Sequence, residues 1–267
     1  MTGHAQGFRL IVHPKMEGRL DMAIDEALTE AVGSGRSEQV VRLYGFSPAT
    51  LSLGRFQRTA GALLKENLDR DGVTLVRRPT GGHAVLHDDE LTYSVILSKD
   101  LVAEQLGDSR KQTVYRFIAE LLLSGLQRLG ISARINSSRE GDLRNPDCFR
   151  SSGEFEITAL DGRKLIGSAQ MTTRTAILQH GSIPLTNPGS RVSRYLSAPD
   201  PADSREPTSL NDQADRCFTF DEVQSAFAAA FREALHAQDS SLSGAEQEAA
   251  GRILADKFSS DAWNLAH

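Results

Sequence analysis

The chain has few cysteines and no excess of positive charge. Of its 267 residues only Cys148 and Cys217 are cysteines, and neither has a CxxC or CxxH neighbour. Neither a disulfide framework nor a zinc cluster is therefore expected. The 30 Lys and Arg residues are outnumbered by 35 Asp and Glu residues. This balance argues against nucleic acid or an anionic membrane as the main partner.

Long apolar runs are also missing. The longest, such as AELLL and SVIL, are far too short to cross a bilayer. The segment 1–15 lacks the apolar core of a signal peptide. We therefore expect a cytoplasmic protein.

Apolar residues at helical spacing predict helices at the start, centre and end of the chain. The first two cover 20–32 and 109–129, the second with a capping box that starts at Ser109. Thr219 and Ser243 each precede a glutamate by three positions, which predicts two further capped helices.

Strand-like runs lie between these helices. They cover 40–44, 50–53, 73–76, 91–97, 154–159, 164–171 and 176–184, and an Asp-Gly pair at 161–162 predicts a hairpin. The segment 187–216, rich in Pro, Ser and Asp, predicts irregular structure. Because helices and strands do not alternate, we expect an α+β fold with a mixed, largely antiparallel sheet packed by helices.

The stretch RRPTGGHAVLHD, residues 77–88, contains a glycine pair behind two arginines. Gly81 and Gly82 allow a positive φ and a close approach to a ligand, and Arg77 and Arg78 could add charge for a phosphate or carboxylate. No Gly-Lys-Ser/Thr follows, and the glycines lead into a strand, so this is neither a Walker loop nor a Rossmann fingerprint. A tight turn explains the same residues equally well.

His83 and His87 follow the glycine pair, four positions apart. Since no helix is expected here, they need not share a face as zinc ligands do, and we expect no metal site. His87 beside Asp88 could serve acid–base chemistry, or could only fix a strand end by hydrogen bonds.

Cys148 lies in a polar, proline-containing loop, NPDCFRSSG. Asp147 would raise the pKa of its thiol, whereas a nearby cation would lower that pKa and favour the nucleophilic thiolate. Arg144 and Arg150 are local candidates for this cation, and Lys164 becomes one if the loop folds over the hairpin. From these residues alone, an unreactive loop thiol is the simpler interpretation, and the same holds for Cys217.

Two later stretches, GRKLIGSAQ and ILQHGSI, combine small residues with a lysine and a histidine. Small side chains leave room for a ligand beside the backbone, and Lys164 could place an ammonium over that space. Alternatively, Lys164 is a solvated turn lysine and the small residues accommodate a neighbouring strand. The residues concerned are Gly167, Ser168, Ala169 and Gln170 in the first stretch, and His180 and Gly181 in the second.

Together these stretches resemble the biotin/lipoate A/B protein ligase superfamily, most of all its cysteine-dependent octanoyltransferases. They occur in the family's order and cover nearly the whole chain: MAIDEAL, PATLSLGRFQR, RRPTGGHAVLHDDELTYSV, NPDCF, GRKLIGSAQ, LQHGSI and KFSSDAWN. The resemblance implies a fold similar to the catalytic domain of biotin protein ligases. We expect an acyltransferase catalytic domain over 1–218 and a helical segment over 219–267 packed on it.

The implied reaction is transfer of an octanoyl group from acyl carrier protein to a lysine of a lipoyl domain, such as glycine cleavage H protein or a 2-oxoacid dehydrogenase E2. The position matching Cys148 would carry an acyl thioester, and the position matching Lys164 would lie beside it and lower its pKa. The acyl tunnel would be lined by the Gly81–Gly82 loop and the Gly167–Gln170 strand. The other substrate-binding candidates are Arg77, Arg78, His83, His87, His180 and Gly181. We expect a monomer that needs no cofactor and no ATP.

Three rivals stay open. An ATP-dependent lipoate–protein ligase would use Lys164 and the glycine loop, and Cys148 would be incidental. His83 stands where such ligases usually carry a third glycine, which favours the transferase. An amidotransferase between lipoyl domains would share Cys148 and Lys164. A non-catalytic acyl-binding relative is the rival from another class, although both Cys148 and Lys164 are present.

Overall fold

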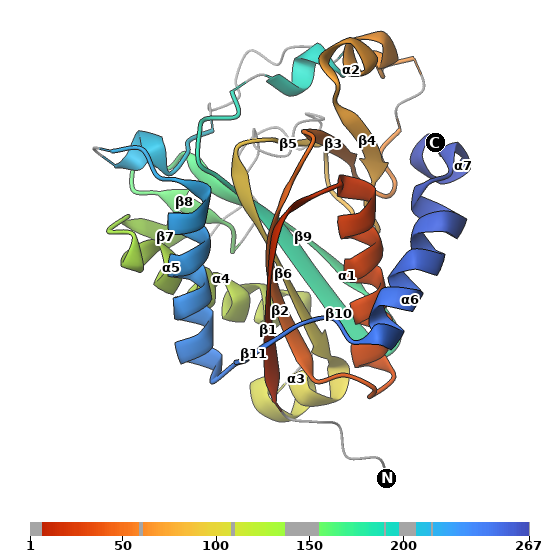
Figure 1. Cartoon of the computed structure of the whole chain (residues 1–267). Helices are drawn as coiled ribbons and strands as arrows, with labels where there is room; N and C mark the ends of the chain where they lie inside the picture. The colour runs from red at the N-terminus through yellow and green to blue at the C-terminus, as the bar shows by residue number, and fades with distance from the viewer. Residues whose placement is uncertain are drawn as a thin grey trace.

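The computed structural model of the chain describes residues 7–58, 61–107, 110–136, 155–189, 191–197, 207–214 and 216–266. Its centre is an eight-stranded sheet with the strand order β11-β1-β2-β6-β10-β9-β8-β7, covered by helices on both faces (Figure 1). The strands are β1 (Phe8–Met16), β2 (Gln39–Phe46), β6 (Glu90–Ser98), β7 (Ala133–Ile135), β8 (Ile157–Ala159), β9 (Lys164–Thr172), β10 (Ala176–Pro184) and β11 (Gln238–Ser240).

The large sheet is mixed and largely antiparallel. Only β1 pairs in parallel, with β2 on one side and β11 on the other, and the remaining pairings are antiparallel. The predicted fold class is therefore confirmed.

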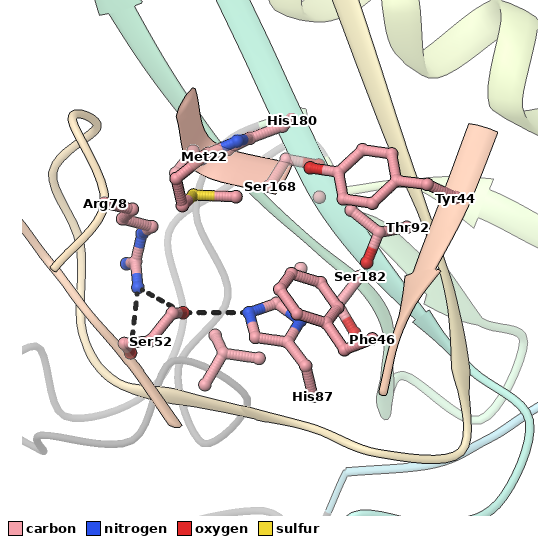
Figure 2. A pocket seen from close by; sticks show the side chains of 14 residues that line it. Met22, Tyr44, Phe46, Ser52, Arg78, His87, Thr92, Ser168, His180 and Ser182 are labelled. Atoms are coloured by element: carbon pink, nitrogen blue, oxygen red, sulfur yellow. Dashed lines mark hydrogen bonds between the residues drawn. The ribbon is translucent and has the colours of Figure 1, made fainter. Parts of the chain in front are cut away.

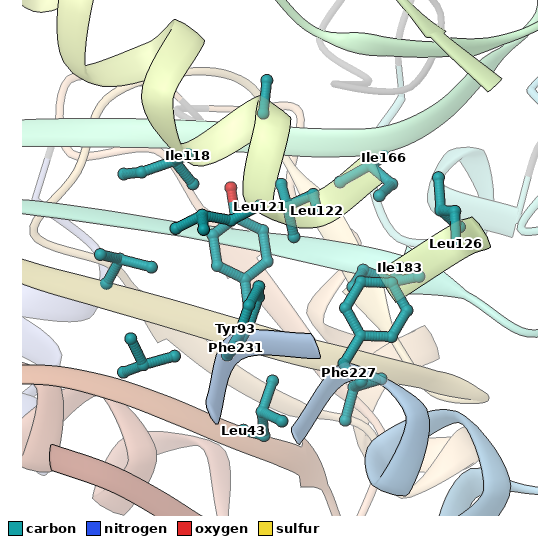
Figure 3. Close-up of a cluster of buried hydrophobic side chains, with 14 of the residues drawn as sticks. Leu43, Tyr93, Ile118, Leu121, Leu122, Leu126, Ile166, Ile183, Phe227 and Phe231 are labelled. Atoms are coloured by element: carbon teal, nitrogen blue, oxygen red, sulfur yellow. The ribbon is translucent and has the colours of Figure 1, made fainter. Parts of the chain in front are cut away.

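Two pairs of helices bury the faces of this sheet. Helices α1 (Gly18–Gly33) and α6 (Gly244–Ile253) lie over one face, and α4 (Lys111–Arg128) and α5 (Phe220–Leu235) over the other (Figure 1). On the α4–α5 face, Phe227 and Phe231 of α5 meet Tyr93 of β6 and the leucines of α4 (Figure 3). Each fully buried Leu or Phe side chain stabilises the fold by about 1.5–3 kcal/mol.

A second, three-stranded sheet in the order β4-β3-β5 lies beside one end of the large one. Its strands are β3 (Thr50–Leu53), β4 (Thr74–Arg77) and β5 (Val85–His87), and helix α2 (Lys65–Asp71) leads into β4. Helix α3 (Lys99–Leu106) follows β6 directly. The short helix α7 (Asp261–Asn264) closes on the small sheet, where Asn264 Oδ1 accepts from the Arg77 backbone N–H at 2.9 Å and Trp263 Nε1 donates to the Arg77 carbonyl at 2.7 Å. The glycine stretch is the connection between β4 and β5.

Several local predictions are confirmed. Both C-terminal capping boxes form, at Thr219 of α5 and Ser243 of α6. The hairpin β8–β9 turns at Gly162, whose φ is +86°. Ser109, the predicted start of the third capping box, lies outside the described residues; α4 begins at Lys111, with Arg110 as its N-cap and no side-chain cap bond. None of the helices in the described ranges is long and apolar enough to span a bilayer.

Candidate active site

A pocket that is open to solvent on one side lies between the two sheets. Its wall is mostly apolar, and Figure 2 shows the side chains that surround it. They come from α1, both sheets and the loop after β4: Met22, Tyr44, Phe46, Ser52, Arg78, Val85, His87, Thr92, Gly167, Ser168, Ala169, His180, Gly181 and Ser182.

The polar side chains in this wall hydrogen-bond to other protein groups, which leaves the cavity largely apolar. Tyr44 Oη, for example, donates to Asp25 Oδ2 at 2.9 Å, and Ser168 Oγ lies 2.7 Å from the hydroxyl of Tyr93. Buried polar groups that are already paired can face an apolar ligand without a desolvation penalty. The pocket is therefore suited to a hydrocarbon chain.

One hydrogen-bond network joins helix α1 to the glycine loop through His180 of β10. Asp25 Oδ2 lies 3.3 Å from His180 Nδ1, and Thr80 Oγ1 lies 2.7 Å from His180 Nε2. Burial lowers the pKa of His180 and keeps the ring neutral. Since Asp25 accepts from Nδ1–H, Nε2 accepts from the Thr80 hydroxyl. His180 thus fixes the backbone just before Gly81.

Arg42 faces two buried carboxylates but can balance only one charge. Asp25 accepts from Arg42, Tyr44, Ser94 and His180, whereas Asp21 Oδ2 has no hydrogen-bond partner among the residues that the structure describes. Burial raises the pKa of Asp21 to about 7, against the opposing effect of Arg42. Burial acts in the same direction on Asp25, but the hydrogen bond from His180 and the charge of Arg42 outweigh it, and the pKa of Asp25 is lowered.

This arrangement predicts that Asp21 makes the protein less stable as the pH rises. The folded chain binds the Asp21 proton more tightly than the unfolded chain between pH 3.8 and about 7, so the free energy of unfolding falls across this window. The contribution is fully present below pH 3.8 and is lost as the pH passes about 7. Urea denaturation of Asp21→Asn should show a shallower decline than the wild type. Equal slopes in the two proteins would contradict the assignment.

A second network links the two sheets at the opposite wall. His87 Nδ1 lies 2.6 Å from Glu90 Oε1, and His87 Nε2 lies 2.8 Å from Ser52 Oγ. The imidazole stacks on Phe46 with a centroid distance of 4.1 Å. Glu90 also accepts from the hydroxyls of Thr92 and Ser182. His87 is therefore an oriented imidazole inside the pocket.

The two glycines of the loop differ in the structural constraint that favours glycine. Gly82 has a φ of +94°, which disfavours any other residue, whereas a Cβ on Gly81 would meet no atom within 4 Å. Gly54 packs against the loop so closely that a Cβ there would lie 1.8 Å from the Gly82 carbonyl oxygen. Arg78 holds the loop through its bonds to the carbonyls of Gly81 at 2.9 Å and His83 at 2.6 Å.

Arg77 points away from the pocket. Its Nη1 donates to the carbonyls of Gly54 and Gln57 at 2.7 and 2.9 Å, so it braces the neighbouring loop. The pocket lining includes neither Arg77 nor His83.

Lys164 is buried at the start of β9, with only 4% of its surface exposed. Its Nζ lies 2.9 Å from Glu156 Oε2, so the interpretation of Lys164 as a solvated turn lysine is wrong. Cys148 lies in the segment 137–154, outside the described residues, and its distance from Lys164 stays a prediction. Cys217 is an exposed free thiol.

The strand residues predicted to bind substrate line the pocket in part. Gly181 does so, but a Cβ there would also lie 2.4 Å from the Gly167 carbonyl oxygen, so close strand packing requires this glycine as well. Gln170 turns aside to donate to Gln179 Oε1 at 3.2 Å.

The structure therefore gathers seven of the twelve predicted substrate-binding residues around one cavity: Arg78, His87, Gly167, Ser168, Ala169, His180 and Gly181. The predicted residues outside the lining are Arg77, Gly81, Gly82, His83, Lys164 and Gln170. The other lining residues are not in the predicted substrate-binding set: Met22, Tyr44, Phe46, Ser52, Val85, Thr92 and Ser182. The alternation of Ser52 with apolar neighbours in β3 was the one available signal for a polar group on an inner face.

Comparison with solved structures identifies the kind of fold that carries this pocket. A crystal structure of lipoate-protein ligase A bound with ATP superposes with a TM-score of 0.79 and 25% identity, over 98% of this chain and 99% of the other. A bipartite lipoate protein ligase from Thermoplasma acidophilum gives a TM-score of 0.77 at 24% identity, over 98% and 97% of the two chains. Residues 17–232 match the family of lipoyl protein ligase A/B catalytic domains, and the chain belongs to this family.

Curated relatives refine the class of enzyme. The octanoyltransferase LipM of Kyrpidia tusciae is 38% identical over 97% of this chain and 98% of its own length. That of Bacillus subtilis is 34% identical over 91% and 92% of the two chains. Because the likeness extends over nearly the full length, the chain is an acyltransferase.

Proposed function

We propose that this protein transfers an octanoyl group to the side chain of a lysine in a lipoyl domain, as a step of protein lipoylation in the cytoplasm. The relatives named octanoyltransferase LipM support octanoyl transfer. The observation that carries the proposal is the apolar pocket at the glycine loop, whose polar lining groups bond to other protein groups. The proposed acceptors are glycine cleavage H protein and the E2 subunits of 2-oxoacid dehydrogenases, and the proposed form is a monomer.

The proposed donor is octanoyl-acyl carrier protein, and the proposed nucleophile is Cys148. The Cys148 thiolate attacks the octanoyl carbonyl, a new C–S bond forms, and the phosphopantetheine thiolate leaves. A thioester is exchanged for a thioester, so the step needs no ATP and no cofactor. Splitting the reaction in two lets the two protein partners dock in turn.

Lys164 is the proposed partner of this thiol. A buried ammonium near the sulfur favours the thiolate. Its ion pair with Glu156 holds the ammonium in one position at the start of β9. In the first step the departing phosphopantetheine thiolate takes a proton from the Lys164 ammonium, which leaves Lys164 as a neutral amine. In the second step the acceptor lysine amine attacks the Cys148 thioester and gives its proton to this neutral amine, while Cys148 leaves as the thiolate. Lys164 is the proposed base, ahead of His83.

Intact mass spectrometry tests the proposal. Incubation with octanoyl-acyl carrier protein, without ATP, is expected to add one octanoyl group that hydroxylamine removes and that passes to a lipoyl-domain lysine. Cys148→Ser should lose both the adduct and the transfer. Cys217→Ser is the matched control, because it removes the other cysteine, which is exposed, and should behave like the wild type.

The same assay separates the rivals. The structural neighbour bound with ATP makes an ATP-dependent ligase the nearest of them. Normal modification of the lipoyl domain by Cys148→Ala, only with ATP and free octanoate present, would favour the ligase. Failure of acyl carrier protein to donate, with octanoylated H protein donating instead, would favour the amidotransferase.

A further inference from the structure

Ser52, His87 and Glu90 form a hydrogen-bonded chain that the octanoyl-transfer proposal does not use. Ser52 Oγ lies 2.8 Å from His87 Nε2, and His87 Nδ1 lies 2.6 Å from Glu90 Oε1. The three residues are buried, with 0%, 7% and 2% of their surfaces exposed. They come from β3, β5 and β6, so the fold rather than a local motif brings them together.

The hydrogen-bond partners decide where the protons lie. An ionised carboxylate only accepts, so the proton of the neutral imidazole is on Nδ1, and Nε2 accepts from the Ser52 hydroxyl. Arg78 Nη1 donates to the same Ser52 oxygen at 3.1 Å (Figure 2). This is the order carboxylate–imidazole–hydroxyl in which histidine takes the proton of a serine nucleophile.

The chain of hydrogen bonds faces the apolar pocket between the two sheets. Ser52, Arg78 and His87 all line the pocket, together with the apolar side chains of Phe46 and Val85. A guanidinium beside the serine oxygen can stabilise the negative charge that develops on an attacked carbonyl oxygen.

We propose that Ser52 is a second acyl-accepting nucleophile and that the protein hydrolyses activated medium-chain esters and thioesters without Cys148. Ser52 Oγ bonds to the carbonyl carbon while His87 takes its proton, and the C–O or C–S bond breaks as the leaving group takes that proton from His87. Water then attacks the serine ester, with His87 moving the proton again, and releases the fatty acid and free Ser52. Only the choice of a medium-chain acyl group rests on the proposed function.

Two probes test this centre in the Cys148→Ala protein. Octyl fluorophosphonate transfers its phosphonyl group to an activated serine with loss of fluoride, and 4-nitrophenyl octanoate reports turnover. We expect one phosphonyl adduct on the peptide that contains Ser52, together with steady release of 4-nitrophenol. Ser52→Ala should lose both, and His87→Gln and Glu90→Gln should slow labelling by at least about 100-fold.

Ser94→Ala provides the matched control. Ser94 is also a fully buried serine, but its hydroxyl donates to Asp25 rather than to an imidazole, so this variant should label at the parent rate. No adduct on Ser52, or labelling that is insensitive to His87→Gln in folded protein, overturns the proposal and leaves the network as a link between strands. If Ser52→Ala does not fold, the position of the phosphonyl adduct in the parent protein and the labelling rate of His87→Gln decide whether Ser52 is the nucleophile. Octanoyl transfer to a lipoyl domain by the wild type is measured separately, so either proposal can fail without the other.

Discussion

Replacement of Arg42 by methionine is expected to lower the free energy of unfolding by about 3–5 kcal/mol. Arg42, Asp21 and Asp25 are fully buried, and the guanidinium bonds to both carboxylates. Its removal takes away the guanidinium that ion-pairs with the buried carboxylates of Asp21 and Asp25. Urea denaturation followed by circular dichroism measures the loss.

Arg116→Met is the control for this experiment. Arg116 forms an ion pair with Glu120 at 3.1 Å on the surface of α4, where both side chains are more than half exposed. Such pairs contribute about 0.5 kcal/mol or less. If Arg42→Met lowers the free energy of unfolding by no more than Arg116→Met does, the buried network contributes no more to stability than a surface ion pair, and the prediction is contradicted.

Gly54→Ala is expected to reduce octanoyl transfer by about 100-fold, with a loss of about 1–3 kcal/mol in stability. The new Cβ would lie 1.8 Å from the carbonyl oxygen and 2.7 Å from the carbonyl carbon of Gly82. Because both are backbone atoms, no side chain can move aside and the glycine loop must shift. The transfer rate to a lipoyl domain and hydrogen exchange at residues 78–83 measure the two effects.

Gly251→Ala is a suitable control for the added methyl group. Gly251 lies in a helix, α6, where a Cβ meets no atom within 4 Å, so alanine should keep the activity and stabilise the helix by up to about 1 kcal/mol. Unchanged activity in Gly54→Ala would show that the position of the glycine loop does not limit the reaction.

Local signals in the sequence predicted much of the fold. Helical spacing identified α1 and α4, and the glutamates three positions after Thr219 and Ser243 identified the caps of α5 and α6. The elements that were missed have weak local signals. The strand β11 has only three residues, Gln-Asp-Ser, all exposed, and exists because β1 offers it a parallel edge.

The sequence predicted those pocket residues that belong to a recognisable motif. It did not predict the residues that only tertiary contacts bring into the pocket. His87 and His180 attracted notice as titratable residues near glycines, and both line the pocket. No sequence motif marks Ser52 as a site residue, because its hydrogen bond is to an imidazole 35 positions later in the chain. The stretch around Lys164 does not indicate that this lysine is buried, because its partner Glu156 lies eight positions earlier, just before β8.

The contact between α7 and Arg77 also has a consequence for how the protein is made. The Asn264 side chain that binds the Arg77 backbone is synthesised 187 residues later. On the ribosome, β4 and the glycine loop therefore emerge long before the helix that secures them. The large sheet can pair β1, β2, β6 and β10 before this contact forms, and α7 binds the Arg77 backbone only after Asn264 has emerged.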